Sequence, residues 1–100
     1  MDEITEVKLN GKRYSLRRES DGRGDSGMML NAICPKEFKA VDKGVIKVGY
    51  AVQCGSPFAR TMDNQDWWCT TPVSKILSVN DDKTEVRFKT GNSIYICRVI

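Results

Sequence analysis

The residues best suited to chemistry gather around two adjacent tryptophans, Trp67 and Trp68, in a chain of 100 residues. Side chains that form hydrogen bonds surround this pair, and a later turn adds three more. The candidate binding residues are Arg60, Gln65, Asp66, Trp67, Thr70, Thr71, Asn92, Ser93 and Tyr95. An aromatic face stacks on a base for about 1–3 kcal/mol, and arginine binds phosphate or carboxylate through two parallel hydrogen bonds. The pattern predicts a pocket for a nucleotide-like anionic small molecule, with Arg60 on the charge and Trp67 or Tyr95 on the ring.

A structural role for the same residues remains open. Adjacent residues of a strand point to opposite faces, so we expect at most one of Trp67 and Trp68 in the core. The other is then exposed, covered by a loop, at a protein interface or in a binding site. Asn92 follows Gly91 and fits a tight turn equally well.

Catalysis is disfavoured because the chain has no histidine. The segment Gly24-Asp25-Ser26-Gly27 matches the nucleophile segment of chymotrypsin-like proteases, but that chemistry needs a histidine to take the serine proton. The spacing of the four cysteines contains no C-x-x-C motif and favours free, mostly buried thiols over disulfides or zinc ligands. We therefore expect no enzyme, no metal and no cofactor; a cysteine-based enzyme is the weaker alternative.

The charge of the chain permits an anionic partner without requiring one. The formal net charge is +3, and the first quarter of the sequence is rich in Lys and Arg. Alternation along residues 12–18 places Arg13 and Arg17 on an outward face, where they are candidates for an anion- or nucleic-acid-binding surface. The alternative is a solvated face whose charges protect a sheet edge from pairing.

The elements that must position these residues are short strands. We expect a hairpin over residues 4–18 with a tight turn at Asn10-Gly11, a flexible glycine-rich loop over 19–27, a strand over 45–54 and a three-stranded meander over 73–99. Residues 35–40 are expected to form at most one helical turn. This pattern predicts a single all-β domain, residues 1–100, in the form of an SH3-like barrel or a curled antiparallel sheet of five to six strands, with an OB-like barrel as the alternative.

The start of the chain lacks the apolar segment of a signal peptide, and no apolar run is long enough to span a bilayer. We therefore expect a cytoplasmic protein that does not contact membranes.

Several segments resemble a group of short proteins of bacteriophages and other mobile elements of gut bacteria. The matching segments are Met29–Pro35, Ala59-Arg60, Gln65-Asp-Trp-Trp68, Thr70–Val73, Ile76-Leu77 and Val86–Tyr95. In that group an ARS-type step, a QDWW-T-T core and an F-K-T-x-N-S-x-Y hairpin recur in this order; here Thr61 replaces the serine. The resemblance covers about residues 28–96. It implies an origin rather than an activity, and small phage proteins of this kind are often counter-defence factors.

Two functions follow as expectations. The first is a ligand-binding module that sequesters a nucleotide-like anionic molecule, such as a host signalling nucleotide. The alternative is an inhibitor or regulator that binds a host protein or nucleic acid through its surface and its basic N-terminal segment. Self-association is compatible with both.

Overall fold

The computed structural model describes residues 4–56 and 67–100, and these residues form β-strands and no helix. The strands are β1 (Glu6–Lys8), β2 (Tyr14–Arg18), β3 (Gly24–Gly27), β4 (Met29–Cys34), β5 (Lys39–Lys43), β6 (Val45–Lys47), β7 (Ala51–Gly55), β8 (Trp67–Cys69), β9 (Val73–Val79), β10 (Glu85–Thr90) and β11 (Ile94–Val99). The all-β class predicted from the sequence is confirmed. Within the described part of the chain there is no helix of the length and apolarity that crossing a membrane requires.

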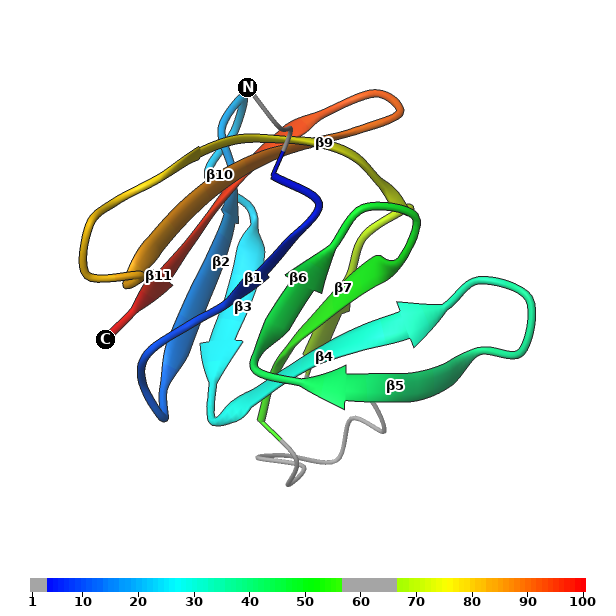
Figure 1. Ribbon diagram of the computed structural model, residues 1–100, viewed down its shortest axis with the longest axis horizontal. Coiled ribbons are helices and arrows are strands. Elements are labelled where there is room, and N and C mark those ends of the chain that lie inside the picture. Colours follow the sequence, from blue (N-terminus) through cyan, green and yellow to red (C-terminus); the bar gives the residue numbers. More distant parts are fainter. Residues whose placement is uncertain (1–3, 57–66) are drawn as a thin grey trace.

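The strands form three antiparallel sheets. The largest has the order β3-β2-β11-β10-β9, the second has the order β5-β4-β7-β8, and β1 pairs with β6. Figure 1 shows β1 and β6 between the two larger sheets. The β4–β5 hairpin of the second sheet extends away from the rest of the fold. The predicted curled antiparallel arrangement is confirmed. The closed barrels are not observed, because none of these three sheets returns to its own first strand.

The core lies where the inner faces of the two larger sheets meet. Alternate residues of the five-stranded sheet point inward, among them Leu16, Phe88 and Cys97, which are fully buried. Val52 and Cys54 of the four-stranded sheet belong to the same hydrophobic cluster. The predicted meander over residues 73–99 is confirmed as β9, β10 and β11, which pair in chain order.

The predicted hairpin over residues 4–18 is wrong, because β1 pairs with β6 and β2 pairs with β3 and β11. A type I′ turn needs positive φ at both central residues, and neither Asn10 nor Gly11 has it. Instead the Asn10 N–H donates to the carbonyl of Lys83. A Cβ on Gly11 would lie 2.2 Å from a methyl carbon of Val99, so this glycine permits close packing of two segments.

Glycines also explain two other departures from the prediction. Residues 24–27 form β3, although a flexible loop is predicted over 19–27. A Cβ on Gly27 would lie 2.2 Å from the carbonyl oxygen of Gly55, so β3 passes against the end of β7. The predicted strand over 45–54 is broken at Gly49, whose φ of 92° turns the chain from β6 into β7, in a different sheet. Residues 35–38 form the turn between β4 and β5 rather than a helical turn.

Candidate functional site

The structure places six of the nine candidate pocket residues. Arg60, Gln65 and Asp66 lie outside the described residues, so their share of the predicted pocket stays a prediction. The six described residues are Trp67, Thr70, Thr71, Asn92, Ser93 and Tyr95.

The two tryptophans lie on opposite faces of β8, as the alternation of a strand requires. Trp68 pairs with Cys54 in register and packs against the buried core. Trp67 pairs with Gly55, which in turn pairs with Met29, on the other face of the four-stranded sheet. Its side chain is only partly buried.

Trp68 joins the four-stranded sheet to the five-stranded sheet. Its indole N–H donates to the Tyr95 hydroxyl, with 3.4 Å between nitrogen and oxygen. The guanidinium carbon of Arg18 lies 5.5 Å from the centroid of the Trp68 ring, within the range of a cation–π contact. The Tyr95 ring is 5% exposed and stacks on Phe88, with the centroids 5.6 Å apart. This cluster of Arg18, Trp68 and Tyr95 therefore ties the sheets together.

The cation of this cluster already has an acidic partner. Arg18 donates to Asp21 through both Nε and Nη2. These bonds, with the backbone N–H of Arg23, hold the pKa of the Asp21 carboxyl at about 2, below its ordinary value. An incoming anion would have to displace Asp21. The sequence does not indicate Arg18 as a binding candidate, because Arg18 lies far from the tryptophans in the chain and nothing in the pattern predicts its contact with Trp68.

The remaining candidates do not converge on this cluster. The buried Thr70 hydroxyl accepts the Val52 N–H and donates to the carbonyl of Thr71, which makes it part of the backbone connection between β7 and β8. Thr71 is exposed. Asn92 and Ser93 line an open cleft with Glu19, Lys89 and Ile94. Lys89 and Ile94 belong to the outer face of the five-stranded sheet, whereas Tyr95 points to its inner face.

The outer face of the five-stranded sheet carries a surplus of positive charge. We define the basic face as the outward residues Ser15, Arg17, Ile94, Ile96, Arg98, Glu85, Arg87, Lys89, Lys75 and Ser78, with Glu19 at its edge. Five cations and two carboxylates lie on it, a surplus of three that equals the formal charge of the whole chain. Arg17 and Arg87 flank Ile96 across three adjacent strands. Arg13 is exposed just before β2.

The carboxylates of the basic face neutralise only two of its cations. Arg87 donates to both oxygens of Glu19, at 2.8 and 2.9 Å, and these bonds lower the pKa of the Glu19 carboxyl. Arg98 lies 3.4 Å from Glu85. Arg17, Lys75 and Lys89 are exposed and form no ion pair with another described residue.

Burial makes two of the four thiols poor nucleophiles. All four are free, and Cys54 and Cys97 are buried. Burial raises the pKa of Cys54 to about 12 and raises that of Cys97 well above its ordinary value, so both stay protonated at neutral pH. Burial also raises the pKa of Cys69. The described residues contain no group of three or more Cys, Asp or Glu side chains placed to hold a metal ion.

Comparison with known proteins gives no matching family model, curated protein or solved structure. The resemblance to short proteins of mobile elements therefore stays a prediction.

Proposed function

We propose that the protein binds nucleic acid by its phosphate backbone, through the basic face. The observation that carries this proposal is the position of Arg17, Lys75 and Lys89, which have no ion pair within the described part of the chain. Lys75 and Lys89 are directly opposite each other in register on β9 and β10. Like charges in such a pair destabilise a sheet. Phosphate groups bound between the two lysines would offset this repulsion.

Protection of a sheet edge does not account for these charges. The edges of the five-stranded sheet are β3 and β9, so a lysine on β9 fits that role. Arg17 on β2 and Lys89 on β10 lie on inner strands, where both backbone edges are already paired. Edge protection therefore does not explain these two charges. Solvation of an exposed sheet face explains them without a partner, and a polyanionic partner is the explanation that we propose.

The composition of the face favours contact with the backbone over readout of bases. Its apolar members are Ile94 and Ile96, and none of the outward residues defined above is aromatic. Stacking, which gives single-strand binders much of their affinity for bases, has no platform here. We therefore expect weak dependence on sequence and strong dependence on salt.

The resemblance to mobile-element proteins suggests how such binding would be used. A counter-defence factor in the cytoplasm of a bacterial host would cover nucleic acid that a host enzyme would otherwise attack, without catalysis of its own. This part of the proposal depends on the resemblance alone. Sequestration of a nucleotide around Arg60 and Trp67 remains the alternative, and calorimetry with cyclic nucleotides tests it.

The direct test of the main proposal is fluorescence anisotropy with labelled single-stranded and duplex oligonucleotides of mixed sequence at low salt. We expect binding to each with little preference among sequences. An acidic protein of matched charge, added as competitor, distinguishes phosphate recognition from general attraction to anions. Absence of binding to any oligonucleotide at about 50 mM salt, where phosphate contacts are strong, would remove the proposal.

A further inference from the structure

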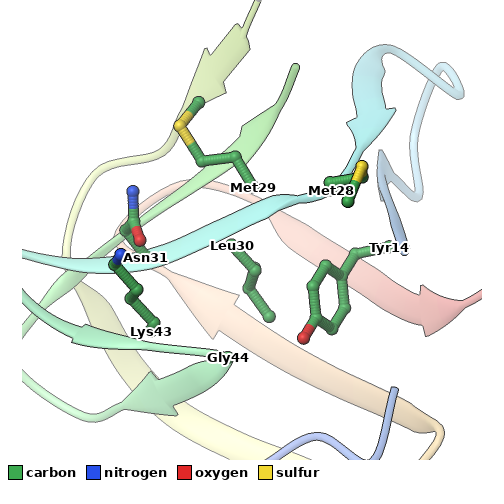
Figure 2. Close-up of a pocket in the computed structure, with 7 residues that line it drawn as sticks. All are labelled: Tyr14, Met28, Met29, Leu30, Asn31, Lys43 and Gly44. Atoms are coloured by element: carbon green, nitrogen blue, oxygen red, sulfur yellow. The ribbon is translucent and has the colours of Figure 1, made fainter. Parts of the chain in front are cut away.

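A pocket with a volume of about 270 Å³ lies beside β4 and shares no residue with the basic face. Figure 2 shows it between Tyr14, the β4 residues and the start of the segment that leaves β5. Tyr14, Met28, Met29 and Leu30 give it apolar walls, and Asn31 and Lys43 give it polar groups.

The pocket exists because β5 does not extend alongside the first residues of β4. Lys43 is the last residue of β5, and Gly44 takes a φ of 70° that sends the chain to β6 in another sheet. The Gly44 N–H still donates to the Leu30 carbonyl, at 2.8 Å. Beyond that bond, toward Met29, β4 has no paired strand on this side among the described residues. A Cβ at position 44 would lie 3.3 Å from the Tyr14 hydroxyl oxygen, so glycine also keeps this wall open.

The apolar walls combine a fixed part with an adaptable part. The Tyr14 hydroxyl donates to the Gly11 carbonyl at 2.7 Å, which fixes the ring, and Leu30 is buried. The methionines are flexible and polarizable, and such side chains adjust to ligands of different shape. Met28 is 58% exposed and stands at the rim. The volume is below the range of about 300–1,000 Å³ typical of pockets for drug-sized ligands.

The polar groups of the pocket include a cation, Lys43, that has no ion pair among the described residues. Lys43 is opposite Asn31 in register, and in Figure 2 their polar ends lie together, apart from the Tyr14 ring. The Asn31 amide donates to the Gln53 side-chain oxygen at 3.0 Å, which fixes its orientation. Lys43 is exposed and forms no ion pair with any described residue.

We infer that this pocket binds a small acid with an apolar body: a carboxylate or a monoalkyl phosphate whose charge lies on the Lys43 ammonium and whose apolar part lies against Met28, Met29 and the exposed remainder of Tyr14. The volume is too small to enclose a ligand as large as a dinucleotide. The inference does not depend on binding of nucleic acid, since the two surfaces use different residues.

The test is a titration followed by amide NMR, with hexanoate, phenylacetate and hexyl phosphate as acids and hexanol and 2-phenylethanol as neutral probes. At concentrations up to about 10 mM, which detects dissociation constants near 1 mM, we expect the acids to shift the signals of Gly44 and the Asn31 side chain. Comparison of the carboxylates with hexyl phosphate assigns the preferred head group. No shift with any acid would overturn the inference, as would shifts confined to other residues.

Three variants assign the site. Lys43→Met keeps the length of the side chain but removes the charge, and we expect it to weaken the acids by at least 10-fold, because a hydrogen bond to a charged group contributes about 1.5–3 kcal/mol. It should leave the alcohols unchanged. Met28→Trp fills the pocket from an exposed position, where folding tolerates the change, and should abolish binding of acids and alcohols alike. The matched control, Lys39→Met, neutralises a cation at the other end of β5; an equal loss in this control would overturn the inference.

Discussion

Neutralising the three cations of the basic face that have no ion pair with residues 4–56 or 67–100 is the sharpest test of nucleic-acid binding. The variant Arg17→Ala/Lys75→Ala/Lys89→Ala removes only exposed side chains without ion pairs to described residues, so we expect it to fold normally. It also removes the repulsion between the ammonium groups of Lys75 and Lys89, which are paired in register. Its stability to urea should therefore equal or slightly exceed that of the wild type.

The expected magnitude follows from counterion release. Three phosphate contacts give a slope of log K against log salt concentration of about −2 for single strands and about −2.7 for duplex DNA. Between 50 and 200 mM salt, the wild type should therefore lose affinity by about 20-fold for single strands and about 40-fold for duplex. Arg87 and Arg98 would steepen these slopes only if they bound phosphate in place of Glu19 and Glu85, their present ion-pair partners. The triple variant should lose most of the salt dependence along with the affinity.

A control of equal charge distinguishes a specific face from net charge. Lys8→Ala/Lys36→Ala/Lys39→Ala also removes three exposed cations, but from β1 and the β4–β5 hairpin, away from the basic face. We expect it to keep the wild-type slope and nearly the wild-type affinity in the same anisotropy assay. If both triple variants lose affinity equally, or if the wild type binds equally well at both salt concentrations, the assignment of the face is refuted.

Three further predictions concern the fold. Gly11→Ala places a methyl group against Val99 and should destabilise the protein by about 1–3 kcal/mol in urea titrations, whereas Gly91→Ala, with open space around it, should have little effect. The pKa of Asp21 is lowered from 3.8 to about 2, so the stability that its carboxylate contributes is complete above about pH 4 and is lost as the pH falls toward 2. The difference in unfolding free energy between the wild type and Asp21→Asn should therefore shrink over that interval. A constant difference would contradict the role of Arg18. Cys54 and Cys97 should resist iodoacetamide in the native protein at pH 8 and react in urea, as mass spectrometry of the labelled peptides would show, and rapid native labelling of either would contradict their burial.

The alternation of apolar and polar residues predicts the strands of the C-terminal half well. β9, β10 and β11 are joined by short turns, so local pairing is also the final pairing. Alternation also separates Trp67 from Trp68 correctly. These features depend on residues close in sequence, which a single chain reveals directly.

Pairing between distant segments was not predictable in the same way. The Asn10-Gly11 dipeptide is typical of a hairpin turn, but contacts with Lys83 and Val99 decide its conformation. Gly27 and Gly49 look like loop residues, although one permits the contact of β3 with β7 and the other ends β6. A glycine needed for close approach and a glycine needed for flexibility look the same in a sequence.

The same limit applies to the predicted pocket, which stays a prediction. Aromatic residues drew the prediction to the tryptophan segment, but Trp68 and Tyr95 join two sheets and their polar atoms bond to each other. In a small protein, large aromatic side chains dominate the energetics of the core, so their presence alone says little about ligands. Arg17 and Lys89 lie on inner strands, and they neither fill the core nor form ion pairs with described residues. Only the strand order, which places β2, β11 and β10 side by side, reveals that Arg17 and Lys89 share one face, and our proposal of a polyanionic partner rests on that placement.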